Sequence, residues 1–177
     1  MKRLSLLALL LVAAPFAQAQ EQRIGYVDSE YIFSKLPAYT TVQQTLERQA
    51  QTWQREVEDK QQEVDGLFRD YQARELLYTQ QERQQRREEI VAAEREVEAM
   101  RTRYFGPEGE LYRQQETLMR PIQELLLTTI DDIATREEYT YIFDKSGDFL
   151  FLYADEREDL SDEVLRELGV DVEVPNN

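Results

Sequence analysis

Residues 46–78 read LERQAQTWQREVEDKQQEVDGLFRDYQARELLY, and their apolar side chains recur every seven residues. One seam consists of Ala50, Val57, Val64, Tyr71 and Tyr78, and a second seam, four residues earlier, holds Leu46, Trp53 and Leu67. Lys60 and Arg74 interrupt the second seam. Apolar residues at this spacing share one face of an α-helix, so the pattern predicts a long helix that packs on a partner through an imperfect seam.

The same spacing resumes after a wholly polar stretch at residues 79–87, where Ile90, Val97, Tyr104, Leu111, Leu118 and Leu125 are seven apart, with Ala93 and Met100 between them. Thr79 and Glu82 have the spacing of a capping box, which begins helices. We therefore expect a helical hairpin over residues 40–138 with its tip near 78–81. The ascending arm, residues 40–78, would be about 60 Å long at 1.5 Å per residue.

The returning helix must pass Gly106-Pro107-Glu108-Gly109. Proline removes a helical hydrogen bond and clashes with the preceding turn, so a kink or short break is expected there. An alternative places the tip of the hairpin at this Gly-Pro, with very unequal arms. Capping and periodicity favour the earlier tip.

The two ends of the chain carry β-prone runs. Residues 24–27 predict a strand, Asp28-Ser29 can cap a short helix, and Pro37 then breaks the chain. We assign this strand and short helix to a segment over residues 20–39. Residues 139–143 and 149–153 predict a β-hairpin joined by a turn at 144–148. A short helix at 164–168 follows, which Ser161-Asp162-Glu163 caps and Gly169 ends. The segment 139–177 then closes on a polar tail. The predicted class is α+β, mainly α.

The hairpin returns the chain to its start, so the strands from both ends can meet in one small body. Three strands are too few to bury both faces of such aromatic runs, and exposed apolar edges invite pairing with other chains. We therefore expect this body to be completed by oligomerisation; the alternative is a monomer with one small core. The candidate oligomer residues are Ile24, Tyr26, Val27, Tyr141, Ile142, Phe143, Phe149, Phe151 and Tyr153.

The first nineteen residues have the features of an export signal. Lys2 and Arg3 precede an apolar run over residues 4–14, and Ala17-Gln18-Ala19 is a cleavage pattern. The run is short for a bilayer span, although a membrane anchor is the alternative. Cleavage after Ala19 predicts a soluble, exported chain, with the periplasm as its location in a two-membrane bacterium.

Composition excludes several classes of function. The chain of 177 residues contains no Cys and no His and has a formal charge of −15. It therefore lacks the residues of a Cys/His zinc site, and its charge argues against broad nucleic-acid binding. No nucleophile–base constellation and no phosphate-binding glycine loop is visible, so no enzyme, cofactor or metal is predicted.

Several stretches resemble the Skp/OmpH family of periplasmic chaperones for outer-membrane proteins. They are residues 24–29, 118–122, 139–144 and 159–164, while Phe105-Gly106-Pro107-Glu108-Gly109-Glu110-Leu111 is similar to a branch found in Bacteroidetes-like bacteria. The resemblance implies a homotrimer with a β body and three helical arms. It also implies that unfolded outer-membrane proteins are held between the arms without ATP. The alternative is a structural coiled-coil scaffold or spacer of the envelope.

In one respect the chain departs from the family, whose well-known members are basic and use their charge to engage acidic clients and lipopolysaccharide. Here the arginines gather near the expected tip, at Arg74, Arg83, Arg86 and Arg87. They are candidates for a weak client, membrane or lipopolysaccharide contact. The favoured interpretation is that they pair with Glu82, Glu88 and Glu89 along the helix, at i,i+3 or i,i+4 spacing.

Overall fold

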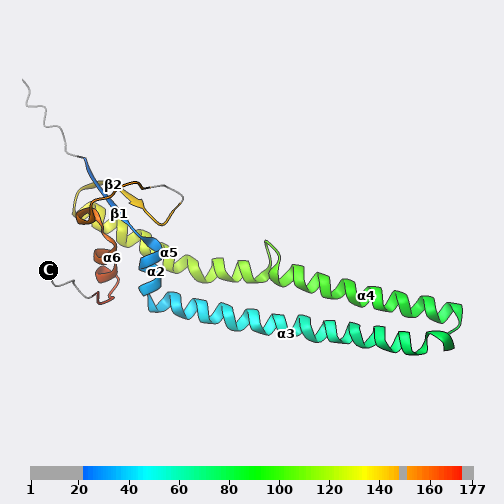
Figure 1. Cartoon of the computed structure of the whole chain (residues 1–177). Helices are drawn as coiled ribbons and strands as arrows, with labels where there is room; N and C mark the ends of the chain where they lie inside the picture. Colours follow the sequence, from blue (N-terminus) through cyan, green and yellow to red (C-terminus); the bar gives the residue numbers. More distant parts are fainter. Residues whose placement is uncertain (1–21, 148–150, 173–177) are drawn as a thin grey trace, which may run out of the picture.

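The computed structural model describes residues 22–147 and 151–172. A long two-helix arm projects from a small α/β body, and both ends of the described chain lie in the body (Figure 1). The predicted signal peptide over residues 1–19, Phe149 and the polar tail after Val172 lie outside the described residues.

The ascending half of the arm is one helix, α3 (Pro37–Arg74). Pro37 occupies the first turn, where its missing N–H costs no helical hydrogen bond. A short 3₁₀ turn, η1 (Glu75–Leu77), follows, and α4 (Gln80–Phe105) runs back. The predicted capping box is present at the start of α4, because Thr79 accepts from the Glu82 N–H and the Glu82 carboxylate accepts from the Thr79 N–H.

The returning helix is broken at the predicted Gly-Pro segment. α4 ends at Phe105, α5 (Glu110–Arg136) begins after a gap of four residues, and the segment between them projects from the side of the arm (Figure 1). Gly109 is buried in this turn, and a Cβ there would stand 2.7 Å from the carbonyl oxygen of Tyr104. A larger residue at position 109 would therefore push α5 away from α4.

The predicted seam holds between α3 and α4 and shifts within α5. Val57, Val64 and Tyr71 of α3 pack with Ile90, Val97 and Tyr104 of α4. Beyond the break, Leu125 of the predicted series is 55% exposed, whereas Ile122 and Leu126 are buried. The residues of the break leave the helical spiral, so counting in sevens across them no longer follows one face.

The body combines both ends of the chain. Strand β1 (Arg23–Val27) leads into α2 (Ser29–Lys35), whose N-terminus is capped by the Asp28 side chain. Strand β2 (Tyr139–Asp144) follows α5, and η2 (Glu156–Glu158) and α6 (Ser161–Glu167) complete the body. The core consists of apolar residues from several of these parts, namely Val27, Ile32, Leu36, Ile122, Leu126, Ile133, Leu160, Val164 and Leu165.

The strand pairing differs from the predicted β-hairpin. β2 pairs in parallel with β1, and Phe151, Leu152 and Tyr153 lie outside any strand. The turn after β2 is bonded to the β1–α2 junction, because Lys145 N–H donates to Val27 O over 2.8 Å and Asp144 accepts from Ser29. These bonds direct the chain away from β2 instead of back along it.

The cap of α6 also differs from the prediction. Leu160 occupies the N-cap position and Ser161 is the first helical residue. The Ser161 hydroxyl donates instead to the Asp159 carboxylate, so its side chain is not available to the helix terminus. Gly169 follows the helix with φ +79°, which supports its predicted role as a stop.

Candidate interaction surfaces

The β1–β2 sheet has one packed face and one open face. On the packed face, Val27 is buried in the body core and Ile142 packs against it. Gly25 shares this face, and a Cβ there would stand 2.9 Å from side-chain carbons of both Leu160 and Tyr139. Glycine at position 25 therefore lets the sheet approach α6, so Val27 and Ile142 belong to the core of a single chain.

The open face carries the other predicted oligomer residues. Ile24 pairs with Tyr141 and Tyr26 pairs with Phe143, which places these four side chains together. Ile24, Tyr141 and Phe143 are exposed, Tyr141 by 53%, whereas Tyr26 is buried. Contiguous apolar side chains of this kind mark an interaction surface more often than isolated ones do.

Phe151 contributes to the cover of Tyr26, over whose ring the Lys145 ammonium also lies, 5.2 Å from the centroid. The ring centroid of Phe151 lies 6.4 Å from those of both Tyr26 and Phe143, and Tyr141 stacks on Phe143 at 6.2 Å. Phe151 thus joins the open face although it is not in a strand. Tyr153 is almost fully exposed.

The two edges of the sheet are also unequal. The outer edge of β1 is partly covered, because Tyr26 bridges to Asp159 and Leu160 N–H donates to Tyr26 O over 2.8 Å. Within the described residues no strand pairs with the outer edge of β2. Two-stranded sheets are marginal alone and parallel strands are usually covered on both faces, so the open face and the outer edge of β2 are the candidate interaction surface of the body.

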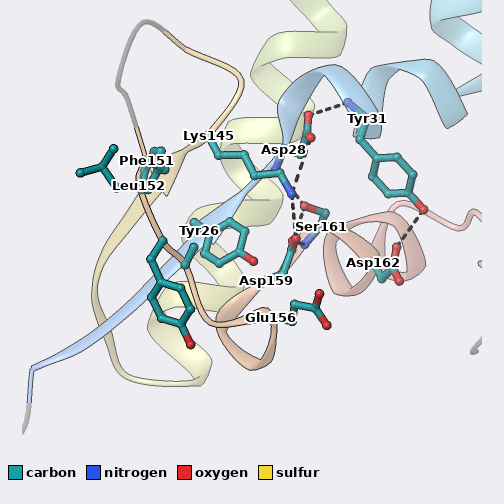
Figure 2. Close-up of a pocket in the computed structure, with 12 residues that line it drawn as sticks. Tyr26, Asp28, Tyr31, Lys145, Phe151, Leu152, Glu156, Asp159, Ser161 and Asp162 are labelled. Atoms are coloured by element: carbon teal, nitrogen blue, oxygen red, sulfur yellow. Dashed lines mark hydrogen bonds and ion pairs between the residues drawn. The ribbon is translucent and has the colours of Figure 1, made fainter. Parts of the chain in front are cut away.

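A polar network fixes the end of the sheet to the helices. The Lys145 ammonium lies 3.1 Å from Asp159 and 3.7 Å from Asp28, and Asp28 N–H donates to the Ser161 hydroxyl over 2.8 Å (Figure 2). Asp144 accepts from both the N–H and the hydroxyl of Ser29. These bonds connect β1, α2, β2 and α6, which include segments distant in sequence.

The same bonds shift the ionisation of the network. Burial raises the pKa of the Asp144 and Asp159 carboxyls, but hydrogen bonds outweigh burial and hold both pKa values below the ordinary one. The bonds to Asp144 come from Ser29 and Ser146, and those to Asp159 from Ser161 and Lys145. Burial lowers the pKa of Lys145, and its bond to Asp159 raises it above the ordinary value. Asp144, Asp159 and Lys145 are thus charged at neutral pH, and their bonds connect the end of the sheet to the helices.

An open pocket of about 770 Å³ lies beside this network, between Tyr26, Tyr31 and Asp162 (Figure 2). Several of its polar groups are occupied by one another, as the Tyr31 hydroxyl donates to Asp162 and Lys145 is paired with two carboxylates. Among the described residues no group of three or more His, Asp or Glu side chains is placed to hold a metal ion.

The arm seam is closed by polar contacts beside its apolar row. Trp53 stacks on Tyr104 at 4.9 Å, and the Tyr104 hydroxyl donates to Glu56 over 2.8 Å. Lys60, which interrupts the predicted seam, lies 2.9 Å from Glu63 on its own helix and 3.1 Å from Glu96 on α4. The interruption is therefore an ion pair across the two helices. These charged residues were visible in the sequence, but only the facing register of the helices brings them together.

The four predicted tip arginines are engaged within the arm. Arg74 pairs with Asp70 at 3.1 Å and Arg86 with Glu89 at 2.8 Å, at i,i+4 and i,i+3 spacing. Arg83 donates to Tyr78 O, and Arg87 donates to Arg83 O. The favoured interpretation, pairing with Glu82, Glu88 or Glu89 along the helix, is thus seen for Arg86 with Glu89. Glu82 instead forms the capping box with Thr79, and Glu88 accepts from Gln84.

Sequence reasoning missed the most exposed apolar pair of the arm. Leu76 is 95% exposed and Leu77 is 81% exposed, and both lie on η1 at the far end of the arm. The available signal was that two consecutive leucines stand outside both seams.

The structure contains no described helix that is long and apolar enough to span a bilayer.

Comparisons with known proteins agree with this architecture. The model of the family described as Outer membrane protein (OmpH-like) matches residues 23–168. A crystal structure of a proposed outer membrane chaperone (OmpH-like) from Caulobacter crescentus CB15 matches with a TM-score of 0.68 and 14% identity, over 83% of each chain. At that identity the likeness concerns the fold alone. No curated protein sequence matches the chain.

Proposed function

This chain belongs to the OmpH-like family, and we propose that it is an ATP-independent holdase chaperone of the periplasm. Its clients would be unfolded outer-membrane β-barrel proteins, held in the space between helical arms. The chaperone description of the Caulobacter neighbour and the shared fold support this proposal. The export pattern that ends at Ala19 supports the location.

The observation that carries the proposal is the open aromatic face of the β1–β2 sheet at the root of a long arm. Tyr141, Phe143 and Phe151 are exposed beside the outer edge of β2, with which no strand of the described chain pairs. Self-association covers such a face and supplies the missing strands, and a homotrimer would place three arms around one cavity. The functional unit is therefore proposed to be the oligomer.

The arms suit the holding of an unfolded chain. An unfolded β-barrel protein exposes apolar side chains and unpaired backbone groups that need shielding. It offers no fixed sequence motif for recognition. Each arm presents a narrow seam with a charged surface, and the break between Phe105 and Glu110 leaves one of its two helices discontinuous. Arms of this kind can spread around clients of different size without nucleotide hydrolysis.

The test uses the mature chain, Gln20 to Asn177. An unfolded outer-membrane β-barrel protein is diluted from urea into it without ATP, and turbidity and the mass of the complex are measured. We expect suppressed aggregation and one client per three chains. Unchanged aggregation with several clients and salt concentrations would contradict the holdase and favour an envelope scaffold or spacer.

A pair of variants tests the role of the open face. Tyr141→Asn with Phe143→Asn should reduce the mass of the assembly towards that of one chain and abolish protection of the client. Tyr112→Asn, an equally exposed aromatic on α5 away from the sheet, is the matched control and should keep the mass. If the double variant keeps the mass of the oligomer, the sheet is not the assembly surface.

A further inference from the structure

The turn at the end of the arm does not need its two leucines. Tyr78 N–H donates to Glu75 O, Arg83 donates to Tyr78 O, and the rings of Tyr71 and Tyr78 stack at 6.3 Å. The capping box of Thr79 fixes the start of α4. The side chains of Leu76 and Leu77 take no part in these contacts and are almost fully exposed. Polar residues would serve the turn equally well, so the leucines indicate a contact outside the chain.

The size of this apolar surface limits what can cover it. Two leucine side chains offer far less area than the roughly 1,000 Å² buried by a stable interface. Such a contact persists only if the partner is already held nearby, because tethering raises its effective concentration to the millimolar range. In the proposed oligomer, the arm tips of the other copies are tethered in this way.

Charge also favours the approach of one tip to another. Residues 69–89 around the tip contain five arginines and five acids, whereas residues 47–68 of α3 contain three basic and six acidic residues. Two of the tip arginines are neutralised by Asp70 and Glu89. Copies of the arm therefore repel one another along α3 and meet without net repulsion at the end.

We propose that the arms of one oligomer contact each other through Leu76 and Leu77 and so close the far end of the space between them. This inference rests on the proposed oligomer and adds a closure to it. The contact is small, so it opens readily when a client enters or leaves.

The absence of cysteine from the chain permits a direct test. Gln81→Cys places a thiol at the start of α4, four residues after Leu77 in sequence, and Gln62→Cys places one at an exposed position about two-thirds of the way along α3. Both variants of the mature chain are oxidised at low protein concentration, and the mass of each oligomer is measured by light scattering. Tethered tips should give disulfide-linked pairs of Gln81→Cys chains about tenfold faster than pairs of Gln62→Cys chains, at a rate independent of protein concentration.

Leu76→Gln with Leu77→Gln is then introduced into the Gln81→Cys chain. Cross-linking should fall to the rate of the Gln62→Cys control while the mass of the oligomer is unchanged. An intact oligomer whose Gln81→Cys chains cross-link no faster than the control overturns the tip contact and leaves the holdase standing. A monomeric mass overturns the oligomer on which both depend.

A vesicle-binding experiment tests whether a lipid surface, and not another arm, covers the two leucines. The wild-type chain and the double leucine variant are sedimented with vesicles of phosphatidylcholine and phosphatidylglycerol. We expect neither chain to sediment. Binding by the wild type that the leucine substitutions abolish would assign the tip to a lipid surface and overturn the contact between arms.

Discussion

The body and the arm are held together by different kinds of contact. In the body, Ile32, Ile133 and Leu165 are fully buried although they come from helices far apart in sequence. In the arm, a single row of apolar side chains lies between two helices, flanked by pairs such as Lys60 with Glu96. The seam of the arm is one row wide, so polar pairs close its sides, whereas several helices pack around the core of the body.

The largest expected effects on stability come from shortening one buried side chain in the core of the body and one in the seam of the arm. Ile133→Ala should lower the free energy of unfolding of the body by about 2–5 kcal/mol, since it leaves a cavity among fully buried groups. Val97→Ala removes two methyl groups from the arm seam and should cost about 1–2 kcal/mol. Urea unfolding followed by circular dichroism measures the first, and hydrogen exchange of α3 and α4 measures the second.

Exposed Leu127→Ala is the control and should change the free energy of unfolding by less than about 0.5 kcal/mol. The comparison fails if Val97→Ala increases exchange in the body as much as in the arm, because body and arm would then unfold as one unit.

Two glycines give effects of opposite sign. Gly25→Ala forces a Cβ against Leu160 and Tyr139 in the body and should destabilise it by about 1–3 kcal/mol. Gly66→Ala meets nothing within 4 Å in α3 and should stabilise the arm by up to about 1 kcal/mol. Thermal unfolding of the two variants and the wild type measures both effects. A stabilising Gly25→Ala would mean that the sheet does not lie against α6 as closely as described.

The smallest expected effect is a dependence of the body's stability on pH. The pKa values of Asp144 and Asp159 are lowered in the folded chain from an ordinary value of 3.8. Their contribution to stability is therefore present above about pH 4 and is lost as the pH falls through the folded values. Urea midpoints of wild type and Asp159→Asn, measured from pH 7 to pH 3, should converge below about pH 4. A constant difference would show that Asp159 acts without its charge.

Much of the arm could be predicted from the sequence. The seam from Val57 to Tyr104 follows a seven-residue period, and the Thr79–Glu82 cap depends on residues three apart. Such features are local, because each helix makes its own backbone hydrogen bonds and its apolar face follows from spacing. The prediction failed where the chain left the spiral at Gly106, since the loop changes which residues face the seam.

The candidate surfaces were predicted in part. The aromatic runs of the body were recognised as candidate oligomer residues. Composition alone did not distinguish Val27, which is buried, from Tyr141, which is exposed. The tip arginines attracted notice through their charge, yet each bonds within its own arm, whereas Leu76 and Leu77 passed unnoticed because they fit no period.

The sequence by itself determined the helical hairpin, the place of its tip and the family resemblance, because these depend on spacing along the chain. Only the tertiary structure decided the parallel pairing of β1 with β2 and the placing of Lys145 between Asp28 and Asp159. The physical reason is that a β-strand forms its backbone hydrogen bonds with another strand, and local propensity does not specify which strand that is. That partner lies more than one hundred residues away in sequence, at the end of the arm's outward and return path.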